Sequence, residues 1–170
     1  MKHTRFLARL ATALALPAAL TLGGCGFTPL YAQPGVAGGL QHVEVVAPQG
    51  RIGYMMRESL DDDLGHAKGE KPLYKLEMVL TEGRQAHGLS TTDVAQRYEF
   101  DLKVVYTLTD LTSGKQVHVG TVYSNISYDS ATQPYAGIAA AEDVQDRLAS
   151  DAAQKVEVQV AAWMAGQHAS

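Results

Sequence analysis

The segment RYEFDLKVVYTLTDLTSGKQVHVGTVYSNISYD, Arg97–Asp129, decides the fold because it consists of two alternating runs around a tight turn. In the first run every second residue is apolar or aromatic, and most residues between them are charged or polar. This alternation is typical of antiparallel strands with one packed face and one solvated face. Thr112–Lys115 supplies the turn, in which Gly114 can adopt a positive φ. We predict a β-hairpin, with a bulge near Gly120 where the alternation shifts.

Two more strands and two helices are predicted around this hairpin. PLYKLEMVLTEGR, Pro72–Arg84, alternates in the same way, and Leu40–Pro48 is a short run rich in β-branched residues. Arg51–Gly65 places apolar residues at four-residue spacing on one helical face. Tyr135–Gly166 repeats apolar residues every three or four positions, which predicts a long amphipathic helix that ends at Gly166.

The resulting order is strand, helix, strand, strand, strand, helix. It predicts an α+β fold, namely a two-layer sandwich with a four-stranded, largely antiparallel sheet and two helices on one face. The other face of the sheet would remain open. The sandwich domain is expected to span residues 40–166, and residues 167–170 are expected to form a disordered tail.

The first 24 residues, MKHTRFLARLATALALPAALTLGG, have a basic start and a short apolar run, as a secretory signal peptide does. The apolar run is too short to span about 30 Å of hydrocarbon. Leu22–Cys25 resembles the lipobox of bacterial lipoproteins, in which the cysteine receives a diacylglycerol and the peptide is cut before it. Cys25, the only cysteine in the chain, is therefore the predicted site of lipid attachment. The alternative is an ordinary signal peptide with a chance cysteine.

Composition limits what the rest of the chain can do. Residues 25–39 are rich in Pro, Gly and small residues and are expected to form a flexible tether. Three of the 14 basic residues and none of the 18 acidic residues lie in the signal, so the mature chain has 11 against 18, a net charge of −7. This charge argues against nucleic-acid binding, which depends on basic surfaces.

The sequence contains no recognisable catalytic constellation. The patterns HExxH and GxSxG and the phosphate-binding loop are missing, and the histidines are not spaced to share a metal. The carboxylates Asp61–Asp63 would point in three directions on a helix. Glu99 and Asp101 share one strand face, which we interpret as solvated. We therefore predict a protein that is not an enzyme and that needs no cofactor or metal.

Several segments resemble the LPS-assembly lipoprotein family, LptE (also called RlpB), in its alphaproteobacterial form. These are GCGFTPLYA around the cysteine, VEVVAPQGRIGYMMRESLDDDL, the hairpin, and ISYDSATQPYAGIAAAEDVQDRLASDAAQKV. The resemblance implies the same sandwich fold and an outer-membrane lipoprotein on the periplasmic face, to which Gly26 after Cys25 also points. It further implies a complex with the β-barrel protein LptD, as a plug that helps the barrel to assemble and binds lipopolysaccharide.

Lipopolysaccharide carries phosphates, so a binding patch should contain basic side chains. The candidates are Arg84, Arg97, Lys115 and Lys103, and the first two are expected to bracket a loop at 85–96. The alternative for each is that it only solvates the end of a strand. An accessory lipoprotein of an ABC-type lipid or solute transporter is a second possible function. A lipid-anchored hydrolase is a third, and it lacks the necessary acid–base residues.

Overall fold

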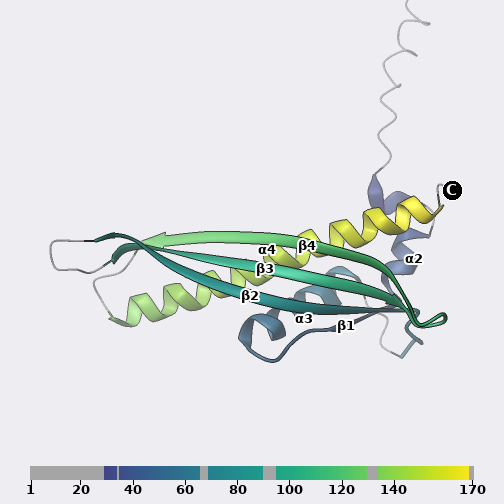
Figure 1. Ribbon diagram of the computed structural model, residues 1–170, viewed down its shortest axis with the longest axis horizontal. Coiled ribbons are helices and arrows are strands. Elements are labelled where there is room, and N and C mark those ends of the chain that lie inside the picture. The colour runs from purple at the N-terminus through teal and green to yellow at the C-terminus, as the bar shows by residue number, and fades with distance from the viewer. Residues whose placement is uncertain (1–28, 34, 66–68, 90–94, 130–133, 169–170) are drawn as a thin grey trace, which may run out of the picture.

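The structure, a computed structural model, describes residues 29–33, 35–65, 69–89, 95–129 and 134–168. Figure 1 shows a long, twisted sheet that lies in front of the helices. In chain order the elements are η2 (Leu30–Ala32), α2 (Val36–Leu40), β1 (Val43–Val46), α3 (Arg51–Asp63), β2 (Tyr74–Leu89), β3 (Ala95–Asp110), β4 (Lys115–Asp129) and α4 (Pro134–His168).

The predicted α+β fold with a four-stranded sheet is confirmed. The strands are arranged in the order β1-β2-β3-β4. β1 is parallel to β2, whereas the pairs β2–β3 and β3–β4 are antiparallel. The parallel pair exists because α3 crosses over between β1 and β2, as a βαβ connection requires. The expected number of helices was too low, because the short helix α2 adds a third.

The core lies between α4 and the inner face of the sheet. Tyr106 of β3 is fully buried there, and its hydroxyl donates a 2.7 Å hydrogen bond to Gln159 of α4. Gly120 of β4 leaves room for this ring, because a Cβ at Gly120 would lie 2.3 Å from the tyrosine Cζ. The bulge predicted near Gly120 lies three residues earlier, at Val117, which has no partner on β3.

Part of the expected tether is helical and packed. Val36 and Leu40 are buried, at 0% and 3% exposure, and belong to the same core as the sheet. Gly39 lies so close to Met164 of α4 that a Cβ would be 2.9 Å from its sulfur. The four-residue spacing of Val36 and Leu40 gives this short helix one apolar face. Residues 25–28 and 34, including the lipidation candidate Cys25, lie outside the described residues.

Helix α4 extends beyond its predicted end. It continues through Gly166 to His168, since one glycine costs a helix only about 1 kcal/mol. The predicted disordered tail is thus helical at 167–168, and 169–170 lie outside the described residues. Pro134 stands at the first helical position, where a missing N–H costs nothing. None of the described helices is long and apolar enough to cross a membrane.

Candidate functional site

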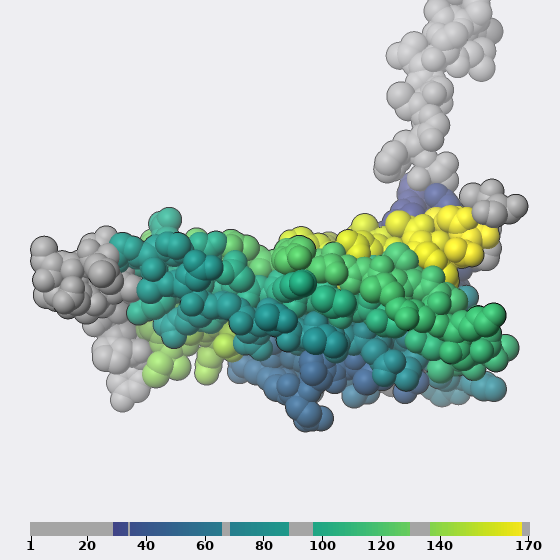
Figure 2. Space-filling view, in the orientation of Figure 1, coloured from purple at the N-terminus to yellow at the C-terminus, as the bar shows by residue number. Residues whose placement is uncertain are grey.

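The helices cover one side of the sheet and leave the other side, here called the outer face, open. The outer face comprises the odd-numbered residues 79–87 of β2, 97–107 of β3 and 119–129 of β4, as the cross-strand register requires. Figure 2 looks onto this face, where the three long strands form a broad surface. The open face expected from the two-layer architecture is therefore present.

The outer face is divided into two halves of different chemistry. The half nearer the β3–β4 turn carries β-branched residues, among which Val79 is 66% exposed and Val119 is 50% exposed. Val79, Val105 and Thr121 form one row across β2, β3 and β4. The other half, nearer the end of β2 and the start of β3, carries charged and amide side chains instead. A surface of this kind can pack against apolar groups at one end and hydrogen-bond at the other.

The polar half is held together by a hydrogen-bond network. His87 Nε2 lies 2.9 Å from Glu99 Oε2, and Asn125 Nδ2 donates to both Glu99 and Asp101, the latter at 2.7 Å. Gln85 Nε2 donates to the other oxygen of Asp101 at 3.4 Å. The pKa of Glu99 is lowered mainly by the hydrogen bond from Asn125 and to a smaller extent by the hydrogen bond from His87. Glu99 is thus kept ionised, and both carboxylates accept hydrogen bonds, which suits a binding surface better than acid–base chemistry.

A shallow, open depression of about 430 Å³ lies between the two halves. Its floor is at Gly83, which has no side chain and pairs with Asp101. Lys103, Tyr123 and Asn125 are among the residues that line it. Within the described residues, no group of three or more His, Cys, Asp or Glu side chains is placed to hold a metal ion.

The four basic candidates do not form one patch. Arg97 and Lys103 lie on the outer face, six residues apart on β3, which corresponds to about 20 Å. Arg97 Nε is 3.0 Å from Asp129 Oδ1, and Lys103 Nζ is 5.9 Å from the centroid of the Tyr123 ring.

The other two candidates lie elsewhere. Arg84 pairs with Phe100 and therefore points to the helix side of the sheet, where its guanidinium lies 4.1 Å from the ring centroid of Tyr98. Lys115 starts β4, at the end of the sheet opposite Arg97. The expected loop at 85–96 is mostly strand, since β2 runs to Leu89 and β3 begins at Ala95. Arg84 and Arg97 therefore lie on opposite faces and do not bracket a loop.

Sequence reasoning did not identify Asn125 and Tyr123 as parts of this surface. The signal that could have found them is the hairpin register. Counted from the pair Asp110–Lys115, a regular hairpin would place Asp101 opposite Ser124, which is buried. The extra residue at Val117 shifts the register by one, so that Asp101 lies opposite Asn125. The outer-face residues of β3 therefore lie opposite the outer-face residues of β4.

The sandwich matches a known family. A family model described as "LptE: Lipopolysaccharide-assembly" matches residues 40–160, which include the whole sheet, α3 and most of α4. The chain belongs to the LptE family. This membership gives it a role in lipopolysaccharide assembly, and the family is not a catalytic one. A search of curated protein sequences found no match.

Solved structures share the LptE fold. A crystal structure of a putative lipoprotein from Caulobacter crescentus CB15 is 44% identical, has a TM-score of 0.67, and the match covers 78% of this chain and 97% of that one. Rare lipoprotein B from Shewanella oneidensis is 14% identical, with a TM-score of 0.58 and coverage of 74% and 96%. A minor lipoprotein from Acinetobacter baumannii is 19% identical, with a TM-score of 0.52 and coverage of 71% and 88%. The last two, at such low identity, show the fold alone.

Proposed function

We propose that this LptE-family chain is an outer-membrane lipoprotein, anchored through Cys25 on the periplasmic face, that plugs the LptD β-barrel and helps it to assemble. The observation that carries the proposal is the family match over residues 40–160. The Caulobacter crescentus protein, which is 44% identical and is described as a putative lipoprotein, supports the anchored state. Two or three acyl chains hold a protein stably, at about 0.8 kcal/mol per buried methylene.

The physical properties of the outer face suit a plug. Barrel interiors are polar, so a surface that enters one needs satisfied polar groups and no large apolar patch. The network around Glu99 and Asp101 supplies such groups, and the apolar half is limited to three valines among threonines. A lipid anchor in the same membrane keeps the plug close to the barrel, which raises its effective concentration.

The partner can be tested by photocrosslinking with a matched control. Tyr123 on the outer face and Tyr54 on α3 are both 65% exposed, so each can be replaced by p-benzoylphenylalanine with little effect on the core. We expect irradiation of cells to join the Tyr123 variant, and not the Tyr54 variant, to a large outer-membrane barrel. Crosslinks to inner-membrane permease subunits would favour the accessory role in an ABC-type transporter. Equal crosslinking at both positions would contradict the outer-face proposal.

We further propose that Arg97 and Lys103 contact the phosphates of lipopolysaccharide, because they are the two candidates on the outer face. The double variant R97A/K103A should then bind lipopolysaccharide roughly tenfold more weakly, by loss of charge-assisted hydrogen bonds. R84A/K115A removes the same charge from other surfaces and is the matched control. An equal loss of affinity in both double variants would show only a general charge effect.

A further inference from the structure

Two segments that are far apart in the sequence contain no charged residue. None of the 11 basic and 18 acidic residues of the mature chain lies in Cys25–Val43 or in Val158–Ser170. The preceding part of α4, Glu142–Glu157, is densely charged with both signs. A helix at a protein surface normally keeps charged residues on its solvated side. The loss of charge in the last turns of α4 therefore indicates a different environment.

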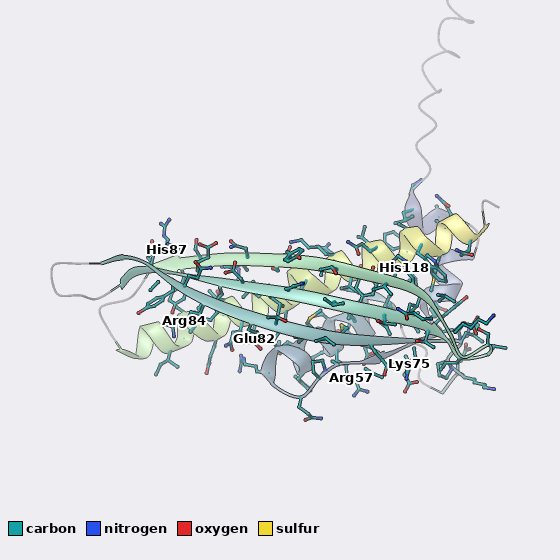
Figure 3. The ribbon with its side chains drawn as sticks, viewed as in Figure 1. Arg57, Lys75, Glu82, Arg84, His87 and His118 are labelled. Atoms are coloured by element: carbon teal, nitrogen blue, oxygen red, sulfur yellow. The ribbon has the colours of Figure 1, made fainter. Side chains whose placement is uncertain are left out.

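The two uncharged segments meet in the folded domain. Both η2 and α2 pack on the C-terminal part of α4. Gly39 of α2 lies next to Met164 of α4, so close that a Cβ would be 2.9 Å from the methionine sulfur. Figure 2 shows the purple atoms of η2 and α2 beside the yellow atoms of α4 at one end of the molecule. Figure 3 shows the labelled charged side chains Arg57, Glu82 and Arg84 well away from this end.

This end of the domain keeps apolar side chains on its surface. Tyr31 of η2 is 44% exposed and Val158 of α4 is 45% exposed. Ala37 of α2 and Ala162 of α4 are exposed as well. These four residues are here called the uncharged end. Since Ala162 follows Val158 by four positions, the two lie on one side of the helix.

The charged groups at the border of the uncharged end are already engaged. Tyr31 donates a hydrogen bond to Glu157, and burial raises the pKa values of Glu157 and of Asp63 at the end of α3. Further desolvation raises such pKa values more, so these carboxyl groups can become neutral beside an apolar phase. On α4, Lys155 donates to Asp151 at 2.5 Å and to the carbonyl oxygen of Tyr123 at 2.9 Å.

The segment between the lipidation site and this end is short. The five residue intervals from Cys25 to Leu30 reach at most about 18 Å. A bilayer that contains anionic phospholipids repels a protein of net charge −7 within a Debye length, about 8 Å. An end without charge avoids this repulsion, and tyrosine is favoured at the level of the headgroups. We propose that the uncharged end lies on the bilayer surface, with Tyr31 and Val158 among the headgroups.

This inference rests on the anchored state in the proposed function, and it adds a second attachment to the membrane. A lipid alone leaves the domain free to rotate about its tether, whereas a lipid and a protein surface together fix the direction of the sheet. The outer face stays available to the barrel, because none of the four residues of the uncharged end belongs to it.

Brominated lipids test the contact, because bromine quenches tryptophan fluorescence only at close range. Trp163, the only tryptophan, is first replaced by Phe, which keeps an aromatic ring beside Tyr74. Val158→Trp is then added to the acylated full chain in vesicles of phosphatidylethanolamine and phosphatidylglycerol that are brominated near the headgroup. We expect it to lose roughly half of its fluorescence, since side chains at this boundary lie about 5–10 Å deep.

Tyr54→Trp on α3 and Tyr123→Trp on the outer face are the matched controls, because each side chain is 65% exposed and neither belongs to the uncharged end. Both should keep their fluorescence. Quenching of Tyr123→Trp would place the outer face on the membrane, and no quenching of Val158→Trp in chains that float with the vesicles would leave the uncharged end in water. Either result would overturn the proposal. A chain that does not float with the vesicles would instead contradict the anchor at Cys25, and the inference would fall with it.

Ala162→Cys gives a second test that leaves Tyr31 and Val158 unchanged. Because acylation occupies the sulfur of Cys25, the new thiol is the only free one in the chain. On vesicles it should react with a water-soluble maleimide roughly tenfold more slowly than in the Cys25→Ser background, which stays in solution. Ser127→Cys, on the outer face, should react equally in both states. Equal rates for Ala162→Cys in both states would show that no bilayer covers it.

Discussion

Gly120 shows how a single residue determines the packing of the core. Its Cα lies against the ring of Tyr106, and a Cβ would be 2.3 Å from the ring carbon Cζ. Since the tyrosine is fully buried and hydrogen-bonded to Gln159, the ring cannot easily move away. We expect Gly120→Ala to lower the free energy of unfolding by about 1–3 kcal/mol, as overpacking does.

Urea denaturation measures this loss, and Gly83→Ala is the control on the same sheet. At Gly83 the nearest atom to a Cβ is 3.5 Å away and the φ angle is not positive, so the substitution should have little effect or stabilise slightly. Equal losses at Gly120 and Gly83 would show that the tyrosine ring is not the cause.

His118 gives the core a dependence on pH. It lies 3.2 Å from the Tyr106 hydroxyl and stacks on Trp163 at 5.9 Å between ring centroids. Because the single hydroxyl proton goes to Gln159, His118 Nε2–H is the donor in this pair. Burial lowers the pKa of His118. The folded state therefore resists protonation that the unfolded chain accepts below a pH of about 6.5.

The expected result is a loss of stability as pH falls from about 6.5 toward the lowered pKa of the folded state. In His118→Gln, which keeps a hydrogen-bond donor, this part of the acid dependence should disappear. Urea unfolding of both chains across pH 7.5–5 measures the difference. The comparison is needed because Asp63 and Glu157, whose pKa values burial raises, contribute with the opposite sign in both chains. Parallel pH profiles for the two chains would rule out His118 as the source.

Among the elements, α2 changes where the folded domain begins. Leu40 is 3% exposed and belongs to the core, but it ends helix α2 and does not begin the strand that was predicted to start at this residue. Leu40→Ala should therefore lower the free energy of unfolding by about 2–5 kcal/mol, as other large-to-small core substitutions do. The exposed Ala37→Ser on the same helix is the control. A Leu40→Ala chain with unchanged stability in urea would show that α2 contributes nothing to the core.

The strands show which features a sequence reveals and which it does not. The alternation of apolar and polar residues identified the two faces of β3, because successive side chains of a strand point to opposite faces and this can be read from the strand alone. It did not reveal where β2 ends, because Gln85–His87 has no large apolar side chain on either face and its pairing is decided by β3. The prediction that Arg84 and Arg97 bracket one loop was wrong for the same reason. Once the register is known, the two side chains lie on different faces of the sheet. The outer-face network depends on the bulge at Val117. The alternation pattern of the sequence predicted this bulge three residues too late, near Gly120.

For the molecule as a whole, the short distance between anchor and domain matters. Only residues 26–29 separate Cys25 from Leu30, where the packed part of the chain begins. Even fully extended, the five residue intervals from Cys25 to Leu30 reach only about 18 Å. If Cys25 carries the lipid, the end of the domain formed by η2, α2 and the C-terminal part of α4 is held next to the membrane surface. The far end of the sheet, where β2 reaches Leu89 and β3 begins at Ala95, lies away from it (Figure 1).

Cys25→Ser tests this arrangement, because it removes the only thiol that could be acylated. We expect the variant to lose incorporation of labelled palmitate and the mass increase of an acylated mature chain. Its melting temperature should match that of the unaltered chain, since Cys25 precedes the packed segment that begins at Leu30. Ser127→Ala, which removes an exposed hydroxyl group from the outer face, is the control for labelling. Palmitate labelling that persists in Cys25→Ser, or an unaltered mature chain without added lipid mass, would show that the chain reaches its site of action without this anchor.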